Sequence, residues 1–167
     1  MRSAVLLALL VVVLAASAPA TAGSVDPAEG VALWTSPLGD PPRVTRPFDA
    51  PDSPYGPGHR GVDLAGEPGA PVVAAGAGIV VFAGMVAGRP VVSVDHPGGL
   101  RTTYEPVEPA VGAGSAVDRG TSLGVLVPGH AWCPVDGCLH WGLRRGEVYL
   151  DPLDLLRPPA IRLLPLY

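Results

Sequence analysis

Hydrophobic and polar positions divide the chain into three stretches. Residues 4–16 form an unbroken apolar run, residues 34–57 are interrupted by seven prolines, and from residue 58 onward short β-branched runs alternate with glycine-rich breaks. Proline removes an amide donor from a helix interior, so the second stretch is limited to short extended pieces and turns that wrap the core. The third pattern predicts an all-β domain with a meandering antiparallel sheet.

Seven strands are expected in the third stretch, with turn residues between most of them. They cover residues 71–75, 78–83, 90–96, 100–105, 122–127, 139–144 and 147–150. The period of two places Val92, Val94 and His96 on one face of their strand, with Ser93 and Asp95 on the other. Residues 151–156 predict the one helical segment, because an Asp cap precedes a Pro at the first position.

The apolar run at the start predicts a secretory signal peptide, residues 1–22. Arg2 precedes the run, and small residues at 17–22 offer an A-x-A cleavage site after Ala22. An uncleaved membrane anchor is the alternative, but residues 4–16 fall short of the ~20 that cross a bilayer. We therefore expect a secreted, cell-wall or periplasmic protein with no transmembrane span in the mature chain.

The residues after the cleavage site suffice for one domain. We expect a proline-rich lead-in at 23–57, the domain at 58–156 and a tail at 157–167. The formal charge is −4 at pH 7, and removal of Arg2 makes it more negative. This balance excludes the basic footprint of a nucleic-acid-binding protein.

Histidine and carboxylate spacing suggests a metal site. Of the chain's 4 histidines, His59 lies four residues before Asp63, which places both side chains on one face of either an extended or a helical segment. His140, on an expected strand, is a candidate third ligand. Two imidazoles and one carboxylate suit tetrahedral zinc with a fourth position open to water. By spacing alone, structural histidines are the commoner situation.

The order of the motifs adds to this interpretation. In chain order they are His59-x-x-x-Asp63, Gly69-Ala70-Pro71-Val72-Val73-Ala74, Gly78-Ile79-Val80, Val92-Ser93-Val94-Asp95-His96, Thr103-Tyr104, Val117-x-x-Gly120, Leu139-His140-Trp141 and Asp151-Pro152. This series resembles the lysostaphin/LytM family of zinc metallopeptidases, which are peptidoglycan endopeptidases. The resemblance covers about residues 58–156.

The resemblance implies a fold, a cofactor and a substrate class. The implied fold is a LytM-like antiparallel β core of the duplicated-hybrid-motif or barrel-sandwich type, with a zinc groove. The implied Zn²⁺ ligands are His59, Asp63 and His140, and the implied partners are stem or cross-link peptides of peptidoglycan. The mechanism would be attack of a zinc-polarised water on a peptide carbonyl.

Two positions depart from the family's pattern. The family's two catalytic histidines that are not ligands correspond here to Cys138 and Pro106. Glu105 is a candidate replacement base, although strand alternation turns it away from the direction of position 106. His130 is a second candidate, if its loop folds over the groove. For His130, a loop position in solvent is the commoner situation. For His96, we expect burial near the core in a structural role.

The two cysteines, Cys133 and Cys138, predict a disulfide in an exported chain. The rival hypothesis is that a Cys138 thiolate joins His140 on the metal, since both would face the same side of the strand. Buried indoles are commoner than exposed ones, so we expect core packing for Trp132 and Trp141. Arg144 and Arg145 lie at a hairpin turn, and we expect both side chains to be solvated.

The sequence therefore leaves two functional hypotheses. The first is an exported zinc-dependent peptidase of the cell wall, with His130 and Glu105 as catalytic candidates. The second is a non-catalytic module that binds the wall or activates a separate cell-wall amidase, as the residues at 106 and 138 suggest.

Overall fold

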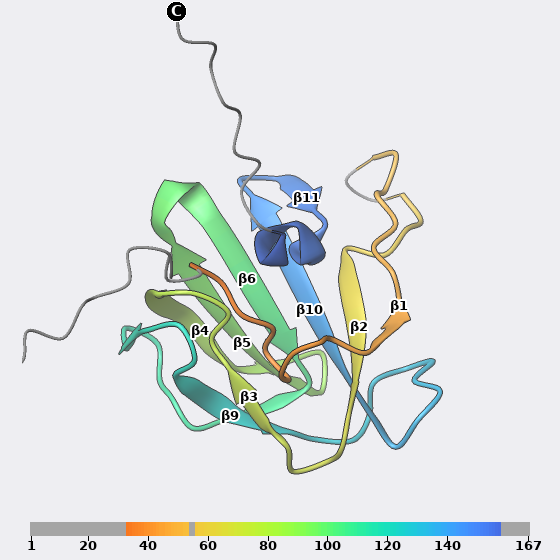
Figure 1. Cartoon of the computed structure of the whole chain (residues 1–167), viewed down its shortest axis with the longest axis horizontal. Helices are drawn as coiled ribbons and strands as arrows, with labels where there is room; N and C mark the ends of the chain where they lie inside the picture. Colours follow the sequence, from red (N-terminus) through yellow and green to blue (C-terminus); the bar gives the residue numbers. More distant parts are fainter. Residues whose placement is uncertain (1–32, 54–55, 158–167) are drawn as a thin grey trace, which may run out of the picture. The chain divides into compact units, whose positions relative to one another are not determined.

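A computed structural model describes residues 33–53 and 56–157 of the chain (Figure 1). The expected signal peptide and almost all of the expected tail lie outside these residues. Within the described residues, no helix is long and apolar enough to span a membrane.

The described chain forms two antiparallel sheets. The larger contains β1 (Val44–Arg46), β2 (Gly61–Gly66), β4 (Gly78–Val86), β5 (Arg89–His96), β6 (Leu100–Glu105), β8 (Ala116–Val117), β10 (Gly137–Arg145) and β11 (Val148–Leu150). Its order is β1-β2-β10-β6-β5-β4-β8, with β11 also paired to β10. The smaller contains β3 (Pro71–Val73), β7 (Val107–Pro109) and β9 (Ser122–Leu126), in the order β3-β9-β7. The predicted all-β antiparallel fold is confirmed.

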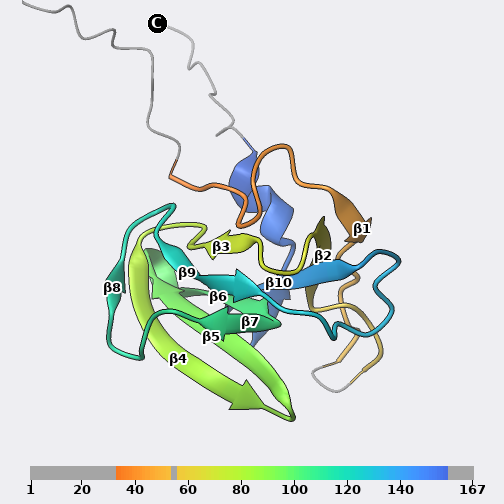
Figure 2. The same ribbon diagram turned by 90° about the horizontal axis from the view of Figure 1, so that it is seen from below.

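The hydrophobic core lies between the two sheets (Figure 2). Val62 and Leu64 of β2 and Leu139 and Trp141 of β10 are fully buried in it. Side chains alternate along a strand, so the residues between these pairs, Asp63 and His140, point to the opposite face of the larger sheet. The same alternation that builds the core therefore presents two of the expected metal ligands on one surface.

The predicted strands match the observed ones closely. β6 has the predicted bounds, and β5 and β9 differ from the prediction by one residue at one end. β4 and β10 run longer than predicted. Four strands were not among those predicted. β1, β7 and β8 span only two or three residues, which carry no periodic signal, and for β2 only extended or turn geometry was expected. The helical prediction holds as the 3₁₀ segment η2 (Pro152–Leu156), whose Asp151 carboxylate accepts a hydrogen bond from the Leu153 amide at 3.0 Å.

His96 is a structural residue, as expected. It is 6% exposed, its Nδ1 donates to the Ala77 carbonyl at 2.8 Å, and its Nε2 lies 2.7 Å from the Thr102 hydroxyl. That hydroxyl lies 2.9 Å from the Tyr104 hydroxyl, which accepts a bond from the Ala75 amide. Burial lowers the pKa of His96, although its bond to Ala77 opposes the shift. These contacts satisfy polar groups within the core.

The described part of the proline-rich lead-in, residues 33–53, packs against the core, as the sequence predicted for this stretch. Trp34, Leu38 and Phe48 are partly buried and pack against the core residues. β1 pairs with β2, which brings the segment after β1 beside His59. The lead-in therefore supports the surface that carries the candidate site.

Candidate metal centre and groove

The three expected metal ligands lie close together in space. Asp63 is on β2, His140 is on β10, and His59 lies just before β2. Asp63 and His140 are direct cross-strand partners in the β2–β10 ladder. His59 lies two residues before β2 and is fixed by a backbone bridge to Asp49, with bonds of 3.0 and 2.7 Å. Each ligand is therefore held by backbone pairing rather than by a loop alone.

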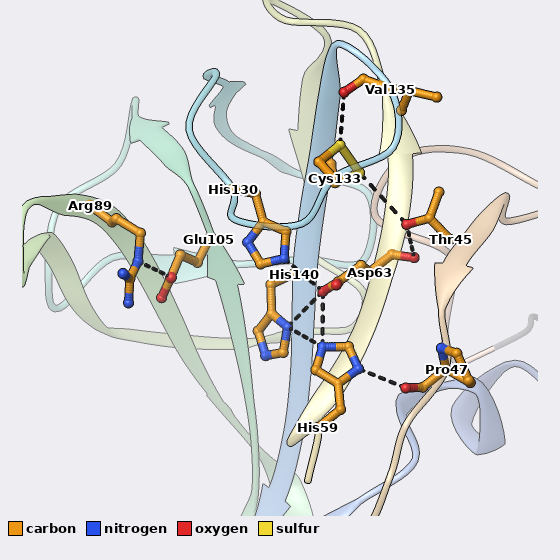
Figure 3. Close-up of polar contacts among 11 residues, drawn as sticks. Thr45, Pro47, His59, Asp63, Arg89, Glu105, His130, Cys133, Val135 and His140 are labelled. Atoms are coloured by element: carbon orange, nitrogen blue, oxygen red, sulfur yellow. Dashed lines mark hydrogen bonds and ion pairs between the residues drawn. A yellow bond between two sulfur atoms is a disulfide. The ribbon is translucent and has the colours of Figure 1, made fainter. Parts of the chain in front are cut away.

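The ligand atoms form a nearly equilateral triangle (Figure 3). His59 Nε2 lies 3.0 Å from Asp63 Oδ1 and 3.0 Å from His140 Nδ1, and the latter two atoms are 2.9 Å apart. Zinc–nitrogen and zinc–oxygen bonds of about 2.0–2.1 Å in a tetrahedron place ligand atoms about 3.3 Å from one another. The triangle therefore has the size of one face of a zinc coordination shell.

The hydrogen bonding of His59 fits a metal ligand. Its Nδ1 lies 2.7 Å from the Pro47 carbonyl oxygen. A carbonyl only accepts, so Nδ1 carries the hydrogen and neutral His59 turns the lone pair of Nε2 toward Asp63 Oδ1. Two lone pairs facing each other at 3.0 Å need a proton or a cation between them. The donor set and its outer hydrogen bond fit zinc.

The Asp63 carboxylate is the shared partner of the histidines in the site, since its Oδ1 lies within 3.1 Å of His59, His130 and His140. Burial alone would raise the pKa of its carboxyl, but contacts with His130 and His140 and the nearby His59 reverse that effect, so the pKa lies well below its usual range. The carboxylate is therefore ionised and suited to hold a cation.

His130 lies beside the three candidate metal ligands, which corrects the expectation of a solvent-exposed loop histidine. Its side chain is 14% exposed and points at Asp63, with Nε2 3.1 Å from Oδ1 (Figure 3). Its ring stacks over His140 with centroids 5.9 Å apart. The buried Nε2 has no partner with hydrogen-bond geometry among the described residues. The His130 imidazole therefore stands beside the carboxylate that the candidate ligands share.

The predicted disulfide between Cys133 and Cys138 is present, with an S–S distance of 2.06 Å. It closes the end of the segment that carries His130 onto β10, two residues before His140. Because both sulfurs are in the bond, the rival hypothesis of a Cys138 thiolate ligand is wrong.

Glu105 faces the groove beside the metal site. It is the direct cross-strand partner of His140 in the β6–β10 ladder and forms an ion pair with Arg89. Pro106 is buried on the other side. The two positions therefore face opposite ways, as predicted, and it is Glu105 whose side chain lies near the ligands.

These residues border a groove of about 350 Å³ that contains His59, His130 and His140. Trp132 stands at its edge and is 90% exposed. The expectation of core packing is therefore wrong for Trp132, which sits at φ 66° in the disulfide-closed loop, but correct for the fully buried Trp141.

Comparison with known proteins decides the family. The sequence profile described as Peptidase family M23 matches residues 57–152, more than half of the chain. The chain belongs to peptidase family M23. An uncharacterised protein of Mycobacterium tuberculosis is 56% identical over 134 residues, which are 78% of this chain and 54% of that protein. The chain thus spans about half the length of that relative.

Solved structures agree with the fold. Helicobacter pylori Csd3 is 26% identical, with a TM-score of 0.63 over 80% of this chain and 37% of Csd3. The catalytic domain of the antimicrobial peptidase lysostaphin from Staphylococcus simulans is 21% identical, with a TM-score of 0.58 over 69% of this chain and 92% of that domain. The lysostaphin/LytM resemblance inferred from the motifs is confirmed.

Proposed function

We propose that this M23 domain is a zinc-dependent peptidase that acts on the peptides of bacterial peptidoglycan. The observation that carries the proposal is the convergence of His59, Asp63 and His140 on one point at the floor of a groove. Three ligands leave a fourth position of a tetrahedral metal for water or substrate. Family membership and the lysostaphin-like fold support the choice of a peptide substrate.

Zinc, when bound, would polarise a water molecule and stabilise charge on the carbonyl oxygen. The chain's own residues would supply the remaining chemistry. His130 lines the groove with its Nε2 3.1 Å from Asp63 Oδ1, so its imidazole is in position to hold or release a proton beside the ligands. Glu105, held by Arg89, is the second candidate for proton transfer.

The leader at residues 1–22 supports a location outside the cytoplasm, where peptidoglycan lies. This part of the proposal rests on the sequence pattern alone. Sequencing the N-terminus of protein recovered from culture medium or cell wall tests it, and we expect the mature chain to begin at Gly23.

The second candidate is a non-catalytic module that binds the wall or regulates a cell-wall amidase. Its support is specific: Pro106 is buried and cannot transfer a proton, and Cys138 is held in a disulfide. The proximity of His130 to Asp63 favours the peptidase, because an imidazole still stands beside the ligands.

A digest of purified peptidoglycan separates the two candidates. The zinc-loaded mature chain is incubated with cell wall, with Asp63→Ala as the control, and released fragments are analysed by mass spectrometry. The peptidase releases fragments that require zinc and Asp63. Wall binding without any fragment release assigns the chain to the non-catalytic class.

A further inference from the structure

The groove at the metal site continues along the outer face of β6 and β10. The hollow beside His130 shares Arg60, Glu105 and His140 with a second hollow, and the second shares Arg101 and Arg144 with a third. The three hollows therefore adjoin one another along this face, from the candidate metal ligands toward the β10–β11 turn, and we call them together the groove.

Five arginines line this groove, and we call them the groove arginines. They are Arg46, Arg60, Arg89, Arg101 and Arg144. The chain has 11 basic residues in all and a formal charge of −4. Among the described residues, Asp95 and Glu105 are the carboxylates that line these hollows beyond the candidate ligand Asp63, and they pair with Arg101 and Arg89. A basic groove in an acidic protein indicates an anionic ligand.

Strand alternation explains why these side chains gather. Thr102 and Tyr104 of β6 are buried, so Arg101 points to the groove side along with Glu105. Arg144 lies on the same face of β10 as His140, and Arg144 and Arg101 are direct cross-strand partners.

Like charges directly opposite each other destabilise a sheet. Asp95 offsets part of this repulsion through its bidentate contact with Arg101. The Arg144 guanidinium bonds only the carbonyl of Gly146 at 2.8 Å and approaches the highly exposed Glu147 at 3.7 Å. The Arg101–Arg144 pair is therefore a place where a bound carboxylate would relieve repulsion.

The floor between the metal site and this pair is open. Gly142 lies between His140 and Arg144 on the groove face of β10 and offers no side chain. Four residues of strand from His140 to Arg144 span about 13 Å, which is also the length of about four residues of extended peptide. If the scissile bond of an extended peptide lies at the metal, the side chain three or four residues away from that bond lies at Arg101 and Arg144.

We propose that the groove arginines select peptides that carry free carboxylates on both sides of the cleaved bond, in preference to neutral peptides such as oligoglycine. Guanidinium groups bind carboxylates through paired, planar hydrogen bonds. Arg101 and Arg144 receive one carboxylate, and Arg46, which lines the hollow beside His130, receives the other. This inference rests on the proposed function, because it takes the peptide to be the substrate of the metal site.

Peptide binding tests the inference separately from cleavage. The Asp63→Ala chain, shown to be folded by thermal melting, is titrated with a fluorescent peptide bearing two free side-chain carboxylates, with its doubly amidated form and with pentaglycine. Using this variant prevents turnover and removes attraction by a bound cation. We expect the acidic peptide to bind most tightly and its affinity to fall with added salt.

Neighbouring arginines on β10 supply a matched pair of variants. Arg144→Gln and Arg101→Gln should each weaken binding of the acidic peptide about three- to fivefold, the range for partly exposed ion pairs. Arg145→Gln should leave it unchanged, because Arg145 lines none of the three hollows. None of the three substitutions should affect binding of the amidated peptide.

Equal binding of the acidic and amidated peptides, or equal effects of Arg144→Gln and Arg145→Gln, would overturn the inference. If the wild-type chain cleaves peptidoglycan but shows no such preference, only the groove inference fails. If the preference is present and zinc-loaded wild type cleaves nothing, the proposed function fails while the basic, anion-binding groove stands.

Discussion

Replacing Gly61 with alanine should damage both the fold and the metal site. Gly61 of β2 is the cross-strand partner of Gly142 in β10. A Cβ at Gly61 would lie 2.4 Å from the Trp141 carbonyl oxygen and 2.8 Å from Nε2 of His140. Non-bonded heavy atoms prefer about 3.5–4.0 Å, so β2 and β10 must separate. The separation would occur two residues from the point where Asp63 meets His140.

The expected loss of folding stability in Gly61→Ala depends on how closely the new methyl group is packed. Overpacking a closely packed site costs about 1–3 kcal/mol. The upper end applies here, because Trp141 is fully buried and its backbone cannot move without disturbing the core. Displacement of the His140 ring should also weaken zinc binding, by about 10- to 100-fold as for other losses of ligand support.

Gly84→Ala is the matched control in the same sheet. A Cβ there would meet only the Phe82 side chain, at 3.5 Å. Since the site has room, the change should be neutral or should stabilise the fold by about 0.4–1 kcal/mol through the unfolded state. The same substitution therefore has opposite signs at two glycines.

Urea unfolding measures the first effect, and zinc titration against a chelator of known affinity measures the second. Gly61→Ala should lower the unfolding midpoint and weaken zinc binding, whereas Gly84→Ala should do neither. If Gly61→Ala unfolds at the wild-type midpoint and binds zinc as tightly, the close approach of β2 and β10 is refuted as the support of the site.

Three further predictions concern the loop and the core. His130→Ala should retain one zinc per chain but slow peptide cleavage by about 100-fold or more; an unchanged kcat would remove His130 from the mechanism. Reduction of the Cys133–Cys138 bond should lower the free energy of unfolding by about 2 kcal/mol, by the loop-entropy scaling. It should also slow peptide cleavage, because the segment that carries His130 loosens. A reductant that changes neither the urea midpoint nor the cleavage rate of the wild-type chain would contradict this. Burial raises the pKa of Tyr104 to about 12, against opposing hydrogen bonds. Because its unfolded value is about 10, this contribution to stability is intact below pH 10 and is lost as pH rises from 10 to 12. Urea midpoints at pH 9 and pH 11 should show the loss, and Tyr104→Phe should show a smaller one.

Local pattern predicted most of the strands of the core, although not β2. Alternation put Val92 and Val94 on one face of β5, which is information that a sequence carries directly. The assignment of Asp63 and His140 as ligands came instead from the family resemblance in the motif order, and the structure brings these two residues together.

Loop geometry and strand register could not be predicted in the same way. His130 reaches Asp63 because the loop between β9 and β10 folds back to a disulfide, with Gly129 at φ 116° and Trp132 at φ 66°. Nothing in the local sequence specifies that path. The groove arginines come from β1, β5, β6 and β10 and the segment before β2, so only the long-range pairing of these strands unites them.

The position of Glu105 shows the same limit. Alternation predicted that it would face away from Pro106, but not which of the two would face the metal ligands. The register of β6 against β10 decides this, since it pairs Glu105 with His140.

Zinc stoichiometry tests the central claim most directly. The mature chain and its Asp63→Ala variant are purified without added chelator, exposed to zinc, desalted and weighed by native mass spectrometry. The account predicts one zinc ion per wild-type chain and none on the variant, with both chains folded. A wild-type chain that holds no zinc, or a variant that holds as much as wild type, would contradict a metal centre built from His59, Asp63 and His140.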